Sequence, residues 1–300
     1  MVWEDDSEVL GTMPRGEPEG LPGGLLSGGV LDRSFRFKPV TGALELTLEE
    51  SAWSAPNHPA RVTAVLCAAL DSLGNGDAAS VDRVRDLSVG DRQFLMRRLA
   101  SHIDDRRFWL TVHCAACREK FDVPVRHSEL PVKPAGEEYP QAVVATGLGR
   151  LRVRVPTGAD QEAIAATGDD DRALQVLLRR ITAAENGASD VDVSRLSREE
   201  VATIEARVEA MAPEVASHLF TTCPYCDREN RVPVSPYACL ERPVGDLFAE
   251  VHRLAFWYHW SEREILELPR SRRQVYLHLI DRSRGMQSAT QLPEPNLSGS

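Results

Sequence analysis

Four of the six cysteines occur as two Cys-x-x-Cys pairs, in HCAACREKFDVPV (residues 113–125) and TCPYCDRENRVPV (residues 222–234). An alignment without gaps superposes both cysteines and the Val-Pro-Val that follows them. Each copy therefore predicts two thiolate ligands, a tight turn and a returning strand, which together form a zinc knuckle. A closed structural zinc site takes four ligands, so each copy supplies half of one site, and we expect one structural zinc per chain. The predicted metal ligands are Cys114, Cys117, Cys223 and Cys226.

Two other interpretations of the pairs remain open, namely two separate redox sites or unliganded thiols. Thioredoxin-like chemistry uses a helix that begins at the second cysteine, whereas both pairs here lead into a predicted strand. His113 and His127 flank the first pair, but Thr222 stands where the second copy would need the counterpart of His113. We therefore expect neither histidine to bind the metal.

The sequence does not predict a catalytic centre. Four thiolates fill the coordination shell of zinc, whereas a catalytic zinc keeps one position open for water or substrate. The chain contains no His-Glu zincin pattern, no phosphate-binding glycine loop between a strand and a helix, and no nucleophile-elbow serine. We expect no enzymatic activity and no small-molecule substrate.

The two remaining cysteines are expected to be structural. Cys67 has only apolar or small neighbours in VTAVLCAALDSL, which favours a buried small hydrophobic residue. Cys239, in SPYACLERP, has a less distinctive setting. Free thiols are typical of reducing compartments, so we do not expect a disulfide framework.

The two halves of the predicted zinc site are far apart in the sequence. Between them lie 105 residues, numbers 118 to 222, whereas a zinc ribbon has about 15–20. The zinc is thus expected to close a long loop that contains a helical insert at about residues 157–215. Within the loop, residues 148–156 alternate like a half-buried strand, and Ser197 and Glu200 form a capping box.

Helical periodicity and cap signals position the remaining elements. Helices are predicted over residues 59–73 and after Ser88, and a strand over residues 108–114 leads into the first knuckle. After the second knuckle come DLFAEVHRLAFWYHW and a helix that opens at a Ser261–Glu264 capping box. The predicted class is α+β: a mostly helical domain with short strands, a zinc-ribbon-like pair of cysteine knuckles and the helical insert between them.

The two ends of the chain differ from this domain, which we place at residues 56–285. Residues 1–55 are rich in Gly and Pro and are expected to form a flexible N-terminal arm. Within the arm, residues 35–48 alternate enough to form a strand, which would bind a neighbouring component. Residues 286–300 are polar and are expected to be a disordered tail.

Composition limits the partners. No run is long and apolar enough to span a membrane, and the start of the chain is acidic, so we expect a cytoplasmic protein with no membrane partner. A net charge of -10 disfavours nucleic acid. Basic residues cluster at 270–284, either as a phosphate-facing patch or as a solvated helix face. If the cluster is a phosphate-facing patch, the protein would be a zinc-ribbon regulator that binds nucleic acid, which is the alternative function.

Four aromatic residues lie close together before the Ser261 cap. They cannot all face inward on one helix, so either one or two are exposed as interface anchors or the group fills the core. These residues are Phe256, Trp257, Tyr258 and Trp260.

Four blocks of the chain, in this order, resemble the T4-like bacteriophage base plate protein family. They are LSVGDRQFLMRRL (87–99) leading into HCAACREKFDVPV, then RVRVPTGADQEAI (152–164), then CPYC (223–226), and then EVHRLAFWYHWSEREILELPRSRRQVYLHLI (250–280). The resemblance covers about residues 60–285. It implies an assembly or structural role in the baseplate hub of phage tails and phage-derived contractile injection systems, with no active site. The implied partners are other baseplate, hub or spike proteins, and the protein is expected in the cytoplasm or within a tail-like particle.

Overall fold

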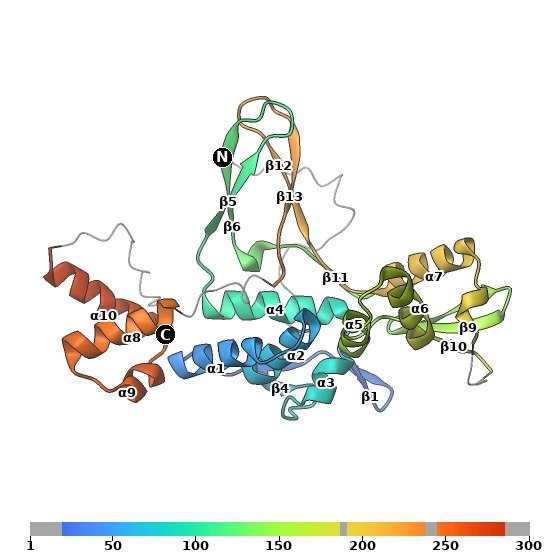
Figure 1. Cartoon of the computed structure of the whole chain (residues 1–300), viewed down its shortest axis with the longest axis horizontal. Coiled ribbons are helices and arrows are strands. Elements are labelled where there is room, and N and C mark those ends of the chain that lie inside the picture. The colour runs from blue at the N-terminus through green and yellow to red at the C-terminus, as the bar shows by residue number, and fades with distance from the viewer. Residues whose placement is uncertain (1–19, 187–190, 238–244, 286–300) are drawn as a thin grey trace, which may run out of the picture.

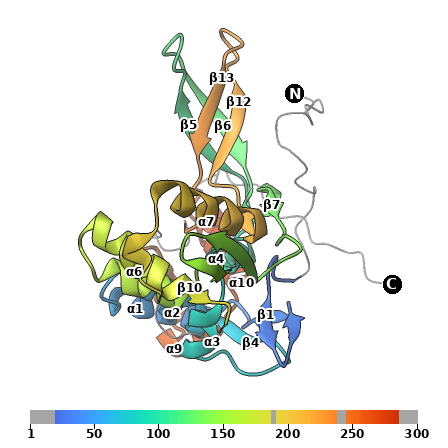
Figure 2. The ribbon, with the colours of Figure 1, turned by 90° about the vertical axis from the view of Figure 1, so that its right-hand side faces the viewer.

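The computed structural model describes residues 20–186, 191–237 and 245–285 (Figure 1). Across these ranges the chain has ten α-helices and short antiparallel strands, which confirms the predicted α+β class. A central helical body carries two hairpins that project from one side, with a small sheet and its helices at one end and the C-terminal helices at the other (Figures 1 and 2). Cys239 and the predicted tail at 286–300 lie outside the described residues.

The central body is organised around one long helix that is buried on most sides. This helix, α4, begins at the predicted cap Ser88, whose hydroxyl accepts from the amide of Asp91, and Phe94 and Leu99 lie in its core. The helix predicted over residues 59–73 ends earlier, and its last four residues form a strand. The elements are α2 (His58–Ala69), β4 (Leu70–Leu73), α3 (Val81–Asp86) and α4 (Val89–Ile103).

Residues 20–55 are part of this body, so the prediction of a flexible arm that extends to residue 55 is wrong for them. Leu21 and Leu44 are buried in the same core as Phe94. The predicted strand over residues 35–48 is also wrong, because it divides into a three-residue strand and a helix capped by Thr41. The elements are β1 (Leu25–Ser27), β2 (Val30–Asp32), β3 (Phe35–Phe37) and α1 (Gly42–Trp53).

Two antiparallel hairpins stand on the body and face each other across a small separate core (Figure 2). One short strand follows the first hairpin, another precedes the second hairpin, and these two short strands pair with each other. The hairpin strands are β5 (Phe108–His113) with β6 (Lys120–Val125), and β12 (His218–Thr222) with β13 (Glu229–Pro233). The short strands at the bases are β7 (Val132–Lys133) and β11 (Glu214–Val215).

The chain between β7 and β11 includes a sheet as well as helices. A three-stranded antiparallel sheet in the order β10-β9-β8 packs with two helices around its own core. The strand predicted over residues 148–156 is present as β9, and the described part of the predicted helical insert at about 157–215 contains three helices and a short strand, β10, that was not expected. The Ser197–Glu200 capping box is present at the start of α7. The elements are β8 (Gln141–Thr146), β9 (Gly149–Arg154), α5 (Gly158–Ala165), α6 (Asp170–Ile181), β10 (Thr182–Ala184) and α7 (Arg198–Met211).

The last three helices form a fourth core of their own. The Ser261–Glu264 capping box is present. Both possibilities for the aromatic group occur together: Tyr258 and Trp260 stack on each other with ring centroids 4.8 Å apart, whereas Phe256 and Trp257 are exposed. The helices are α8 (Gly245–Tyr258), α9 (Glu262–Glu267) and α10 (Arg270–Ser283).

A second internal repeat appears in the structure. Residues 80–103, which contain α3 and α4, align without a gap with residues 261–284, which contain α9 and α10, and the two short helices have the same length and both follow a serine cap. A fully buried arginine occupies the same helical position in each copy. The identical pairs are Ser80 with Ser261, Leu87 with Leu268, Arg92 with Arg273, and Gln93 with Gln274.

A further helix, which begins with Thr-Gly-Ala, packs against each copy of this helix pair. The amide of Gly158, at the start of α5, donates to the carbonyl of Leu87 over 3.0 Å, and the amide of Gly42, at the start of α1, donates to that of Leu268 over 3.4 Å. Both glycines lie against the buried arginine of their copy, so a side chain there would collide with it. The α1 helix thus ties the C-terminal helices to the central body.

Within the described ranges, no helix combines the length and the apolar composition that crossing a bilayer requires.

Candidate metal centre

The two hairpins repeat each other in strand pairing as well as in sequence. His113 pairs with Lys120 in the first hairpin, and Thr222 pairs with Glu229 at the equivalent register in the second. The equivalence continues down both ladders, where Val123 and Val232 point into the shared core. The first cysteine of each pair therefore leaves the end of a strand in the same direction relative to its hairpin.

The turn after each first cysteine has the same backbone design. The amide of Cys114 donates to the carbonyl of Glu119 over 3.0 Å, and the amide of Cys223 donates to that of Arg228 over 2.9 Å. The residue after the second cysteine has a left-handed backbone in both copies, with φ of 65° at Arg118 and 56° at Asp227. This conformation tightens the turn and brings the second thiol beside the first.

The four sulfur atoms meet at the tips of the hairpins. They lie within 4.8 Å of one another, and across the two hairpins Cys114 Sγ lies 3.6 Å from Cys226 Sγ and Cys117 Sγ lies 3.7 Å from Cys223 Sγ. A tetrahedron with metal–sulfur bonds of about 2.3 Å places its sulfurs about 3.8 Å apart. The spacing across the hairpins therefore fits a four-coordinate metal ion bound by both knuckles.

Electrostatics in the cluster favour thiolate at one ligand and thiol at another. The backbone amide of Cys117, helped by that of Ala116, lowers the pKa of the Cys114 thiol to about 6. The amide of Glu119 acts in the same direction on Cys117, but local desolvation of its sulfur and hydrogen bonds with the three neighbouring sulfurs outweigh it and raise the pKa of that thiol to about 12. Four thiols at this spacing cannot all ionise without a cation, which is the charge that a bound metal supplies.

Asn230 links the two knuckles beside the sulfurs. Its side-chain oxygen accepts from the amide of Ala115 over 3.0 Å, and its amide nitrogen lies 3.7 Å from Cys114 Sγ. Asn230 is buried, and the equivalent position in the first hairpin is the apolar Phe121. A polar side chain that bonds to a ligand in this way holds the ligand in place and stabilises negative charge on its sulfur.

The two histidines that flank the first pair do not join the cluster. His113 is exposed on β5, and His127 lies at the base of the hairpin, where its ring is 4.7 Å from that of Phe108. Cys67 is half-buried against the central core, and its burial raises the pKa of its thiol. The structure thus brings together all four predicted ligands and leaves these other candidates outside.

Two features of the site region escaped the sequence reasoning. No sequence motif marks Asn230, because its role depends on contacts with Ala115 and Cys114 of the other knuckle. The repeated Ser-x6-Leu-x4-Arg-Gln of residues 80–93 and 261–274 was visible, but it has only four identities and is much weaker than the cysteine repeat.

The chain matches no protein-family model, no curated protein and no solved structure.

Proposed function

We propose that this chain is a non-enzymatic structural or assembly protein whose two knuckles are joined by one structural zinc. The observation that carries the proposal is the approach of four cysteine sulfurs, from hairpins 106 residues apart in the chain, to 3.6–3.7 Å across the hairpins. A closed tetrahedral shell of four thiolates is a standard ligand set of structural zinc, and because the same set can also hold iron, metal analysis is part of the test.

A structural role for the zinc follows from the ligand set. Four thiolates leave no position for water or substrate, and their combined negative charge makes the metal a poor Lewis acid. Two-stranded hairpins are marginally stable alone. The metal therefore stabilises hairpins whose shared core is small.

Protein recognition is the activity that such a scaffold supports best. The paired hairpins stand clear of the body (Figure 2) and carry exposed aromatic side chains along their length and at a tip, namely Trp109, Phe220 and Tyr225. Exposed aromatic residues on a rigid support are typical anchors of protein interfaces.

The resemblance to T4-like base plate proteins makes the contractile tail or injection-system baseplate the proposed setting. Two of the resembling blocks have a shared structural role, because Ser88 and Thr157 form a bridge at the paired starts of α4 and α5. In this setting the chain would act as a chaperone-like or structural component that binds hub, spike or other baseplate proteins, in the cytoplasm or in the finished particle.

The alternative of a nucleic-acid-binding regulator loses part of its basis. Arg270 and Arg273, from the basic cluster, both bond to Glu45, and Arg273 is fully buried. These two guanidinium groups are therefore directed to a carboxylate within the chain and not to solvent.

The test is co-expression of the full-length chain with the sheath, tube, hub and spike proteins of a contractile tail or injection system from the same source. We expect stoichiometric co-purification with at least one hub or spike protein, and one zinc per chain by mass spectrometry of the metal. Tyr225→Ser or Trp109→Ser should weaken co-purification, and the exposed Leu174→Ser on α6 serves as the matched control. Absence of any baseplate protein from the purified complex, together with retention on duplex DNA, would replace the proposal with the alternative.

A further inference from the structure

The helix repeat allows a direct comparison of α4 with α10, and the two helices differ in what covers them. On α4, one face is covered by the chain's own N-terminal segment. The carboxylate of Asp91 accepts from the amides of Gly23 and Gly24 over 2.7 and 3.2 Å. One turn further, the ring of Phe94 is fully buried and meets the ring of Phe35 edge-on at 6.0 Å.

Among the residues that the structure describes, none covers the equivalent face of α10. Arg272 and Val275 occupy the positions of Asp91 and Phe94, and Leu279 and Arg282 continue the same face along the helix. The spacing of i, i+3, i+7 and i+10 places these four side chains in one stripe. Val275 and Leu279 remain 43% and 45% exposed, and both arginines are exposed. We call these four residues the α10 stripe.

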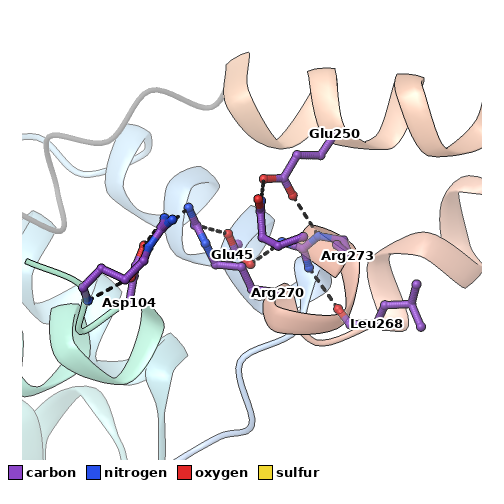
Figure 3. Close-up of polar contacts among 8 residues, drawn as sticks. Glu45, Asp104, Glu250, Leu268, Arg270 and Arg273 are labelled. Atoms are coloured by element: carbon purple, nitrogen blue, oxygen red, sulfur yellow. Dashed lines mark hydrogen bonds and ion pairs between the residues drawn. The ribbon is translucent and has the colours of Figure 1, made fainter. Parts of the chain in front are cut away.

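The opposite face of α10 is fixed, so the stripe is held on a rigid support. Arg273 donates to Glu45 over 2.5 Å, to Glu250 over 3.0 Å and to the carbonyl of Leu268 over 2.9 Å (Figure 3). Arg270 reaches the same Glu45 from the first turn of the helix. These contacts join α10 to both α1 and α8, and they leave the stripe directed away from the core.

The charges at the two ends of the stripe define what would cover it. Arg272 and Arg282 make no ion pair within the described ranges, and ten residues of helix separate them by about 15 Å. Two apolar side chains lie between them. A surface of this kind matches a protein segment whose apolar residues are flanked by carboxylates, since each arginine can pair with one carboxylate while the centre is buried.

We propose that the α10 stripe is a docking site for such an acidic, apolar segment of a partner protein. The chain's own segment at residues 21–37 shows how the equivalent face of α4 is covered. Because Arg272 stands at the position of Asp91, the segment that covers α10 needs carboxylates, whereas the segment that covers α4 offers amide donors to Asp91. Docking here rests on the proposed function in one respect, namely that the chain acts by binding proteins.

The apolar centre of the stripe favours protein over nucleic acid. A phosphate backbone would pair with the two arginines but would leave Val275 and Leu279 against charged oxygens. The net charge of -10 also repels a polyanion, whereas one short acidic segment meets only the local charge of the stripe.

The test uses a random dodecapeptide library displayed on yeast and the full-length, zinc-loaded protein as bait. Binders are counter-selected on the Val275→Asp/Leu279→Asp double variant. We expect enrichment of peptides that contain both apolar and acidic residues. A synthetic peptide from this pool should bind at least tenfold more weakly to the double variant and, at low salt, to Arg272→Glu/Arg282→Glu. The matched control is Val81→Asp, a similarly exposed valine on α3, which should not change binding.

Charge reversal provides the second measurement. A peptide in which lysines replace the acidic residues should bind Arg272→Glu/Arg282→Glu better than it binds the wild type, which a misfolded variant would not do. The proposal fails if no peptide is enriched over the double variant, if enriched peptides are basic, or if the stripe instead drives self-association in sedimentation. It also fails if a 20-base-pair DNA duplex binds through Arg272 and Arg282. Co-purification with hub or spike proteins is scored separately, so loss of one result does not imply loss of the other.

Discussion

Replacement of Cys117 by serine tests the proposed structural zinc site with the least disturbance of packing. Cys117 is exposed at the hairpin tip, so the loss of its sulfur creates no buried cavity. The change removes one of four ligands, and a hydroxyl is a poor zinc ligand at neutral pH. We expect the variant to lose its zinc during purification or dialysis against a mild chelator.

The expected loss of stability follows from the loop that the metal closes. Cys117 and Cys223 are 106 residues apart in the chain, and a cross-link over a loop of this length lowers the entropy of the unfolded chain by the equivalent of about 4.8 kcal/mol. The shared core of the hairpins is small and lies apart from the three other cores, so it cannot replace this constraint. Loss of the metal should therefore reduce the free energy of unfolding by about 3–5 kcal/mol and release the hairpins first.

The assay combines metal analysis, urea unfolding under reducing conditions and hydrogen exchange. The wild type should contain one zinc, and Cys117→Ser should unfold at lower urea with faster exchange in the four hairpin strands. Ala116→Ser, next to it in the exposed turn, keeps all four thiols and should behave as wild type. The reasoning is refuted if the wild type binds two zinc ions or none, or if Cys117→Ser keeps both its zinc and its protection from exchange.

Two further predictions concern the contacts that support the body. Gly158→Ala would place a Cβ 2.2 Å from Nη1 of the buried Arg92 and should destabilise the protein by about 1–3 kcal/mol in urea, and an unchanged midpoint would contradict the proposed close contact. Burial raises the pKa of Asp160, but hydrogen bonds from Arg154, Thr157 and Arg180 outweigh it and hold that pKa below its usual range. The ionised carboxylate of Asp160 therefore stabilises the folded state at pH 7, and this stabilisation is progressively lost as the pH falls below about 4. Asp160→Asn should cost about 1–2 kcal/mol at pH 7 and less at pH 3, and an equal cost at both would refute the charge-based explanation.

Local signals in the sequence predicted the elements close to the cysteines and the caps. The serines at positions 88, 197 and 261 each begin the helix expected of them, because a cap is decided by bonds within four residues. The convergence of the four cysteines was predictable because the repeat fixes the register of each hairpin. The caps depend on single short segments, and the cysteine cluster depends on the comparison of two short segments that repeat each other.

Elements decided by distant contacts could not be predicted in this way. Residues 35–48 alternate like a strand, yet Leu44 and Leu48 are four apart and also fit a helix. The choice depends on Thr41, which bridges to Pro269 more than two hundred residues away. The Gly- and Pro-rich composition before them indicated flexibility, but Gly23 is needed for close approach to Asp91. Tertiary contacts override composition at both sites.

The two repeats join distant segments by different chemistry, and this separates the stability of the hairpins from that of the helices. The hairpins depend on sulfur atoms at their tips and on a core that shares no buried residue with the others. The C-terminal helices depend on Arg273, whose guanidinium is neutralised by Glu45 of α1 and Glu250 of α8. Removal of one partner from such a buried pair is costly, whereas loss of the metal leaves it untouched. The exposed aromatic residues of the hairpins and the α10 stripe are thus held by independent means, so we expect loss of the metal to change binding at the hairpins and to leave binding at the stripe unchanged.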